Sequence, residues 1–323
     1  MPKVNFKILN SLENAAGSLS SEAFELVRSF VASKMHPDGG FVDRSGKADP
    51  YYTVFGLTLA YVFDIKPDIK SFSHFLENWQ SKNKVDFVHA ISIVRCNYLL
   101  EAIKYAGNLG ALSRFVSKMS VSRQDISKLI GKRIASKQKQ VLNLLNDYKA
   151  KSGGYNHLKK NEEAASVYAN FLIYGMFEDL NINQLENKVL AESILELQLL
   201  NGSFVNHPGS KHGIASTTAA GIILLFENGF KVENSTNWLI NQIGPEGGFF
   251  AGEEVPVADI LSTATSLLAL SLSGTSTNQI ITQAVNFVNL HWDESGGFFG
   301  SVADQIPDVE YTFYALLAVG LLK

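Results

Sequence analysis

The stretch from Gly247 to Leu272 reads GGFFAGEEVPVADILSTATSLLALSL, a glycine pair and an aromatic residue followed by a loop and an apolar segment. Its beginning recurs at Gly39-Gly40-Phe41, Gly153-Gly154-Tyr155, Gly202-Ser203-Phe204 and Gly296-Gly297-Phe298. From Gly153 onward the successive copies lie 49, 45 and 49 residues apart. A period of this length is typical of stacked supersecondary units that bury their apolar faces only against one another. We therefore expect residues 1–323 to form a single domain built on one repeat.

The apolar segments that follow the glycine turns begin in a common register, whose typical form is an acidic residue followed four positions later by threonine. The aligned starts are Asp49 to Thr53, Glu163 to Val167, Gly213 to Thr217, Asp259 to Thr263 and Asp308 to Thr312. The segment Asp86 to Ala90 fits the same register inside the long interval between Gly39 and Gly153. It supplies a sixth unit that lacks its own glycine turn.

Each unit is predicted to contain two helices of different character. The segments after the starts, such as Thr263 to Leu272, are apolar or small on every side, as expected for buried inner helices. The segments before the glycine turns, such as Glu22 to Met35 and Ile280 to Leu290, are amphipathic and are predicted to be outer helices. Glycine adopts positive φ without steric cost, so we expect the glycines to end the outer helices.

Six helix pairs can form an open solenoid or a closed ring. An open array needs polar capping repeats, whereas here Lys323 directly follows the apolar inner segment Thr312 to Leu322. The sequence therefore predicts an all-α fold, a closed α/α toroid of about six outer–inner helix pairs. The inner helices would line a central cavity, with their N-termini all facing one mouth.

The repeat as a whole resembles that of protein prenyltransferase β subunits and of squalene or terpenoid cyclases. A glutamine such as Gln198 or Gln242, a Gly-Gly-Phe turn, an acid and a threonine four residues later carry the resemblance, which covers residues 20–323. It implies an isoprenoid or similar amphiphilic ligand in the central cavity, and a zinc-independent transferase or cyclase activity. The alternative is a non-catalytic toroid that binds lipid or serves as a scaffold with a protein partner.

The catalytic groups that the resemblance would imply are replaced here. Prenyltransferases bind zinc through an Asp, a Cys two residues later and a His three residues after the Asp of a later repeat; the matching positions are Asp259, Leu261 and Tyr311. Cyclases protonate an alkene with a DxDD cluster, where this chain has Asp259, Ile260, Leu261 and Ser262. We therefore expect no metal and no other cofactor.

A second metal arrangement, between His89 and Cys96, is disfavoured by distance. Seven residues along one helix separate the two by roughly 10 Å, which is too far for shared coordination of one ion. A helix-start histidine and a core cysteine are the simpler interpretation.

One family feature is present in the first repeat. Arg44, Lys47, Asp49 and Tyr52 look like the pattern with which protein prenyltransferases hold an isoprenoid diphosphate. An Arg fork and a Lys point charge beside helix N-termini form a physically reasonable anion site. The alternative is a solvated loop in which Asp49 caps the inner helix.

The predicted ligand site lies at the mouth formed by the inner-helix N-termini. Its expected residues are Arg44, Lys47, Asp49, Tyr52, His89, Asp259 and Tyr311. Six aromatic residues of the inner helices are expected on the cavity wall: Tyr51, Tyr52, Phe55, Tyr168, Tyr311 and Tyr314.

Charge and composition narrow the function classes further. The stretch Arg114 to Lys139 holds eight basic residues against Asp125 alone, an excess of seven, which leaves −10 on the rest of a chain whose net charge is −3. This stretch suits an anionic headgroup, a diphosphate or an acidic partner, or simply a solvated outer helix. Nucleic-acid binding is disfavoured because the net charge of the whole chain is slightly negative. The single cysteine, the absence of a long apolar run and the N-terminal sequence predict a cytoplasmic protein without a transmembrane segment.

Overall fold

The computed structural model describes residues 4–116, 123–182, 184–255 and 257–323. Helices dominate this part of the chain, and the only paired strands in it are the two-residue strands β1 and β2. The helices are α1 (Val4–Ser18), α2 (Ser21–Ser33), α3 (Pro50–Val62), α4 (Ile69–Lys82), α5 (Phe87–Val116), α6 (Arg123–Lys137), α7 (Lys139–Leu145), α8 (Val167–Leu180), α9 (Gln184–Glu192), α10 (Ala215–Glu227), α11 (Glu233–Ile240), α12 (Ile260–Leu272), α13 (Ile281–Asn289) and α14 (Val309–Leu321). The strands are β1 (Phe41–Val42) and β2 (Ala48–Asp49).

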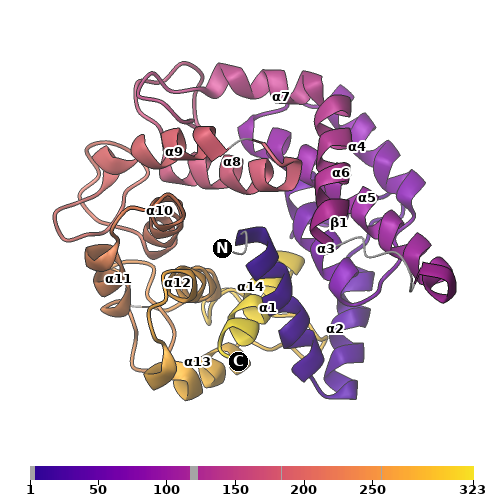
Figure 1. Cartoon of the computed structure of the whole chain (residues 1–323). Helices are drawn as coiled ribbons and strands as arrows, with labels where there is room; N and C mark the ends of the chain where they lie inside the picture. Colours follow the sequence, from indigo (N-terminus) through magenta and orange to yellow (C-terminus); the bar gives the residue numbers. More distant parts are fainter. Residues whose placement is uncertain (1–3, 117–122, 183, 256) are drawn as a thin grey trace.

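The helices form two concentric layers that close into a ring (Figure 1). In the described chain the inner layer consists of α3, α5, α8, α10, α12 and α14, and each of these helices contacts the next. The last inner helix, α14, also contacts the first, α3, so the ring is closed. The outer layer is formed by α2, α4, α6 with α7, α9, α11 and α13. The predicted α/α toroid is confirmed.

A recurring hydrogen bond explains the spacing between the aromatic residue and the threonine. The amide of Phe249 donates to Oγ1 of Thr263 at 2.9 Å, and that hydroxyl donates to the carbonyl of Asp259 at 2.7 Å. The same amide-to-hydroxyl bond joins three other pairs, at 2.9 to 3.0 Å: Phe41 with Thr53, Phe204 with Thr218, and Phe298 with Thr312. In these four repeats the threonine therefore ties the turn to the first turn of its inner helix. In three of them an acid, Asp49, Asp259 or Asp308, also caps that helix, whereas the N-cap of α10 is Ile214.

The predicted register was wrong in two of the repeats. In the third glycine repeat Thr217 was expected in the threonine position, but Thr218 makes the bond, one residue later. In the second, Glu163 was expected to start the inner helix, but Ser166 caps α8 and Asn170 accepts from the Tyr155 amide at 2.8 Å. Serine caps a helix as well as aspartate does, and an amide oxygen can replace a hydroxyl acceptor. The rule of an acid followed by threonine therefore did not identify Ser166 as the cap or Asn170 as the acceptor.

The glycine turns fasten each repeat to the next outer helix. Gly39, Gly153, Gly202, Gly247 and Gly296 all have φ between 90° and 100°. A Cβ on Gly39 would lie 2.5 Å from the Ser71 carbonyl oxygen of α4, and one on Gly296 would lie 2.4 Å from the backbone of Leu26 in α2. The glycines do not end the outer helices as expected, because α2 ends at Ser33 and Gly39 lies further on, in a tight turn closed by the Met35–Phe41 bridge.

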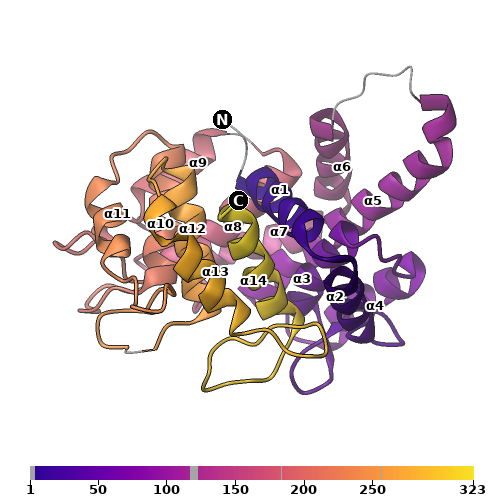
Figure 2. The same ribbon diagram turned by 90° about the horizontal axis from the view of Figure 1, so that it is seen from below.

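Helix α1 is an addition that the repeat pattern does not predict. It crosses the end of the ring where the inner helices terminate, and it contacts α14, α3 and α8 (Figures 1 and 2). Glu178, near the C-terminus of α8, accepts the amides of Val4 and Asn5 at 3.0 and 2.8 Å. A carboxylate at a helix N-terminus is favourable because it satisfies unpaired amides and opposes the helix dipole. The loops with the glycine turns lie at the opposite end of the ring (Figure 2).

The lengths and compositions of the described helices show whether any of them could span a membrane. Even the thirty-residue α5 falls short of the continuous apolar length needed for a bilayer crossing, and this holds for every helix in the described ranges.

Candidate functional site

The mouth formed by the inner-helix N-termini joins the first and last repeats through Arg44. Its guanidinium Nε donates to Asp308, the N-cap of α14, at 2.7 Å, and its Nη1 donates to Asp304. The same guanidinium lies 4.9 Å from the ring centroid of Tyr311, a cation–π contact. Burial alone would lower the pKa of Arg44, but the bonds to Asp308 and Asp304 outweigh it and raise the pKa. The Arg44 fork therefore already holds two carboxylates of its own chain.

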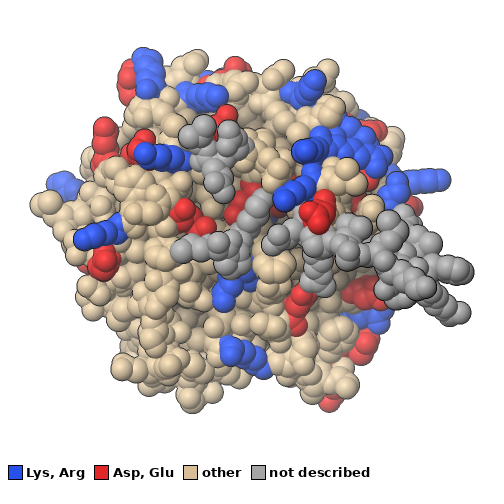
Figure 3. Space-filling view, viewed as in Figure 1, with Lys and Arg blue, Asp and Glu red and all other residues tan. Residues whose placement is uncertain are grey.

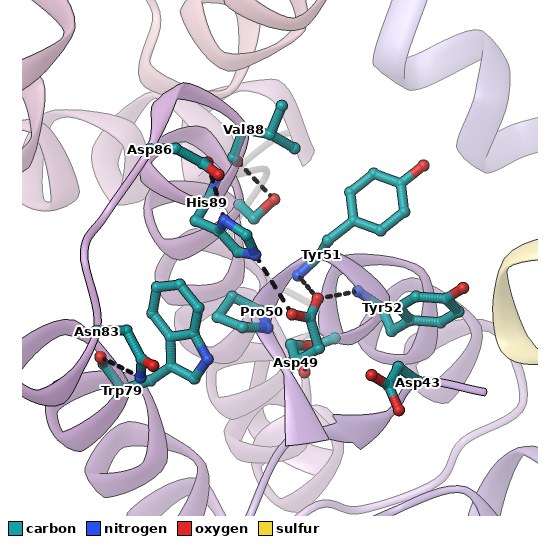
Figure 4. Close-up of polar contacts among 12 residues, drawn as sticks. Asp43, Asp49, Pro50, Tyr51, Tyr52, Trp79, Asn83, Asp86, Val88 and His89 are labelled. Carbon is teal, nitrogen blue, oxygen red and sulfur yellow. Dashed lines mark hydrogen bonds and ion pairs between the residues drawn. The ribbon is translucent and has the colours of Figure 1, made fainter. Parts of the chain in front are cut away.

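His89 joins the first and second repeats at the same mouth. Its Nδ1 lies 2.8 Å from Asp86 at the start of α5, and its Nε2 lies 3.3 Å from Asp49, the N-cap of α3 (Figure 4). The imidazole also stacks on Trp79, with ring centroids 4.5 Å apart. Hydrogen bonds to Asp49 and Asp86 raise the pKa of His89 to about 9. An imidazolium with both nitrogens bonded to carboxylates is a link between two helix starts, and it has no free lone pair for a metal or a proton.

The other predicted mouth residues are distributed around these two links. Asp49 also accepts the amides of Tyr51 and Tyr52, at 2.8 and 3.3 Å. Asp259 caps α12 through the amide and hydroxyl of Ser262, and burial raises its pKa. Lys47 is exposed, and its backbone amide donates to Asp43. Arg44 contacts Tyr311, and Asp49 contacts His89. Among the described residues, no direct contact joins the first of these pairs to the second.

Four of the six aromatic residues expected on the cavity wall pack together: Tyr51, Tyr52, Phe55 and Tyr314. Tyr311 instead lies against Arg44, and Tyr168 lies against His157. Ring centroids of Tyr51 and Phe55 are 5.1 Å apart, and those of Phe55 and Tyr314 are 5.6 Å apart. Tyr52 packs edge-on to Tyr51 at 5.7 Å, and Phe313, which the prediction did not include, lies 5.2 Å from Phe55. Residues of α3 and α14 thus form one aromatic cluster, although more than 250 positions separate them in the chain.

Glu310 lies against this cluster and was missed by the sequence analysis. The Tyr51 hydroxyl donates to its Oε1 at 2.6 Å. Burial raises the pKa of Glu310 to about 7, even though the bond from Tyr51 opposes the shift. Burial and the nearby carboxylate also raise the pKa of Tyr51 well above its ordinary value. A signal was available, because Glu310 is a lone carboxyl in the otherwise apolar segment Val309 to Leu321.

Burial keeps the single cysteine, Cys96, in its neutral thiol form. The Cys96 thiol is fully buried, contacts the Pro50 carbonyl oxygen at 3.4 Å, and has a pKa raised by burial. Within the described ranges no three His, Cys, Asp or Glu side chains come close enough together to hold a metal ion.

Two hollows on the outside of the ring can be compared with the Tyr51–Glu310 pair as candidate sites. One, of about 330 Å³, lies between the end of α2 and the start of α4 and is lined in part by Met35, His36 and Phe72. The other, of about 190 Å³, lies beside the start of α11. Neither includes a strongly perturbed carboxyl, so the Tyr51–Glu310 pair inside the ring is the better candidate site.

Solved structures that share this architecture include the following three. Protein geranylgeranyltransferase-I of Candida albicans, complexed with GGPP, has a TM-score of 0.54 and 16% identity, covering 98% of this chain and 90% of that one. A type II terpene cyclase from Scytonema has a TM-score of 0.56 and 13% identity, covering 97% of both chains. A glycosidase variant in complex with glucose has a TM-score of 0.52 and 12% identity, covering 94% of this chain and 99% of that one. At these identities the similarity establishes the fold alone.

Comparison with curated protein sequences gives no significant match. The family model of the prenyltransferase alpha-alpha toroid domain matches residues 6–92 and 125–323. The matched ranges include every glycine turn and all six starts of the inner helices. Because the match covers most of the chain, and because the ring closes as the repeat predicts, the protein belongs to the prenyltransferase α/α-toroid domain family.

Proposed function

We propose that the protein is an enzyme that uses Glu310 as a general acid and base on a neutral, isoprenoid-like amphiphile held inside the ring. The observation that carries the proposal is the hydrogen-bonded pair of Tyr51 and Glu310 beside the aromatic cluster. A carboxyl with a pKa of about 7 is populated in both protonation states near neutral pH, which is what proton transfer in both directions requires.

Partial exposure of the pair supports a ligand space next to it. Tyr51, Tyr168, Glu310 and Tyr314 belong to inner helices that are surrounded by the outer layer, yet each keeps some accessible surface. Burial is nevertheless the leading cause of the raised pKa of each of these groups, and it raises that of Tyr168 to about 12. Groups that are desolvated but still accessible are expected on the wall of an enclosed space or at the bottom of a mouth.

The acidity of Glu310 favours chemistry at oxygen. Protonating an alkene needs a far stronger acid than a carboxyl of pKa about 7, whereas an ether, alcohol or acetal oxygen accepts a proton from such a group as its C–O bond breaks. The reaction class that fits is therefore exchange at a C–O bond: the leaving oxygen takes the Glu310 proton, and the resulting carboxylate takes a proton from the water or alcohol that attacks the carbon. The aromatic faces of Phe55 and Tyr314 would stabilise positive charge that develops on the carbon.

The polar end of the ligand would lie toward the mouth, where Arg44, Lys47, Tyr52 and Tyr311 would contact it. Since the Arg44 fork already binds Asp304 and Asp308, a neutral head group fits this mouth better than a diphosphate. Calorimetry that compares the affinity for a polyprenyl diphosphate with that for the matching polyprenyl alcohol distinguishes an anionic from a neutral head group. Tight binding of the diphosphate, lost on Arg44→Ala with Lys47→Ala, would assign the mouth to an anion instead.

Glycoside hydrolysis is the second candidate, and one observation favours it. Among the structurally similar glycosidases, one solved variant replaces a glutamate by alanine and another replaces a tyrosine by phenylalanine. Tyr and Glu are also the two members of the pair inside this ring. A glycoside with an apolar aglycone would place its acetal oxygen at Glu310 and its aglycone on the aromatic cluster.

The experiment begins with native mass spectrometry of freshly purified protein, to identify a retained small molecule. Turnover of polyprenyl alcohols, polyprenyl ethers and aryl or prenyl glycosides is then compared for wild type, Glu310→Gln and Tyr51→Phe, with Glu254→Gln as an exposed control. We expect Glu310→Gln to lower kcat by about 10² to 10⁴, and Tyr51→Phe to shift the pH profile. Turnover that survives in Glu310→Gln would refute the assignment, and no turnover or binding of any of these compounds would favour a non-catalytic toroid.

A further inference from the structure

The outer helix α6 has two faces of opposite character. Its inward face packs on α5 and α8, with Ile130 and Ile134 buried, and Gly131 approaches the backbone of Asp179 and Leu180 so closely that a Cβ there would clash. Lys128, Lys132 and Arg133 are exposed, and Leu129 beside them keeps 61% of its surface accessible. The buried face explains why α6 is a helix, while its outward face is turned to solvent.

Positive charge is concentrated on and next to this outward face. From position 125 to 139 the exposed cations are Lys128, Lys132, Arg133, Lys137 and Lys139. Glu101 of α5 lies 3.2 Å from Arg133 and 3.8 Å from Lys137, so it offsets only part of this charge. Lys and Arg side chains gather over α6, at the end of the ring crossed by α1 (Figure 3). The rest of the chain is net acidic, so this concentration is local.

The position of α6 makes the patch accessible to a flat surface. The C-terminal part of α5 and the adjoining α6 project beyond the ring on the side where both chain ends lie (Figure 2). An extended plane that approaches this end of the molecule would meet the projecting helices before the body of the ring.

We propose that the outward face of α6, defined by Lys128, Leu129, Lys132 and Arg133, docks the protein onto an anionic lipid bilayer. Lys and Arg near an anionic leaflet each gain electrostatic attraction, and a protruding leucine among them can enter the headgroup boundary. A purely electrostatic partner, such as a nucleic acid, would use the cations but leave Leu129 without a role. Docking is independent of the chemistry at Glu310, although it would bring the ring to the phase in which amphiphiles dissolve.

Sedimentation with vesicles tests the docking. Full-length protein is mixed with phosphatidylcholine vesicles and with vesicles that also contain phosphatidylserine. We expect binding to the anionic vesicles only, and loss of that binding at about 1 M salt, where the screening length falls to about 3 Å.

Charge reversal identifies the face. Lys128→Glu with Lys132→Glu is expected to weaken binding to the anionic vesicles by at least about tenfold, since each cation near such a surface contributes about 1 kcal/mol. Leu129→Asn should weaken it by a smaller factor. Lys211→Glu with Lys231→Glu changes the net charge equally outside α6 and should leave binding unchanged. Circular dichroism checks that all variants remain folded.

Three outcomes would overturn the proposal: equal binding to neutral and anionic vesicles, wild-type binding by the α6 double variant, or binding to heparin without binding to vesicles. The last result would assign the patch to a soluble polyanion instead.

Discussion

Gly296, in the last glycine turn, packs against the backbone of Leu26 in the first outer helix. The same relationship joins Gly39 to Ser71, Gly202 to Asn234 and Gly247 to Gln283, each time from one repeat to the next outer helix. The contact that spaces neighbouring repeats is therefore also the contact that closes the ring.

Replacing Gly296 by alanine should destabilise the protein by about 2–4 kcal/mol, because φ is 93° and the new Cβ would lie 2.4 Å from Leu26. Gly46 is the matched control: its φ is 81°, but a Cβ there meets nothing within 4 Å, so Gly46→Ala should cost only about 1 kcal/mol. Urea denaturation measures both. Equal losses would mean that backbone strain alone, without the ring contact, sets the cost.

Thr263→Val tests the bond between turn and inner helix. The valine leaves the buried Phe249 amide without its acceptor, so we expect a loss of about 1–3 kcal/mol. The control is Thr265→Val on the same helix, where the hydroxyl donates only to carbonyls of its own helix and the loss should stay below about 1 kcal/mol. If the two variants unfold at the same urea concentration, the repeated hydroxyl bond does not stabilise the turns.

His89 should make stability depend on pH. Its folded pKa is raised to about 9, so its contribution is fully present below the unfolded pKa of about 6.5 and is lost as pH rises through about 9. His89→Ala should therefore cost about 1–2 kcal/mol near pH 6 and much less near pH 10, allowing for the partial exposure of the pair. The free energy of unfolding at both pH values decides the matter. A cost that is the same at both pH values would show that stacking on Trp79, and not the two carboxylates, is what the histidine contributes.

Glu310 should make the free energy of unfolding depend on pH in the opposite direction to an ordinary salt-bridged carboxyl. Because its folded pKa is raised to about 7, the folded state binds the proton more tightly than the unfolded chain does, and stability falls as pH rises from about 4.5 to about 7. Glu310→Gln should consequently raise the free energy of unfolding by about 1–3 kcal/mol near pH 8, with little gain near pH 4. Glu254→Gln, on an exposed loop, should change neither value. A destabilised Glu310→Gln at pH 8 would indicate a partner for the carboxylate other than Tyr51.

The repeat could be predicted from the sequence because its physical requirements are local. Positive φ demands glycine at Gly39 or Gly247, and the turn amide demands an acceptor such as Thr263, so both positions are visible in the chain. Helix α1 could not be predicted in this way, since it belongs to no repeat and is positioned by α14 and by Glu178.

Much of the candidate site depends on pairs that are distant in sequence. Arg44 meets Asp304 and Asp308 some 260 residues later, and only ring closure brings them together. The sequence therefore identified Arg44 as a cation of the mouth but not the carboxylates that bind it. Glu310 differs, because a single carboxyl in an apolar inner helix is a visible anomaly whose partner Tyr51 only the fold reveals.

The position of α1 has a consequence for the order in which the chain is assembled. Its main neighbour is α14, and the carbonyl of Ser11 lies so close to Gly320 that no side chain fits between the two helices. During synthesis α1 leaves the ribosome long before α14, so this contact cannot form until α14 has also been made. Helix α1 must therefore remain without its main packing partner while the helices between α1 and α14 are synthesised.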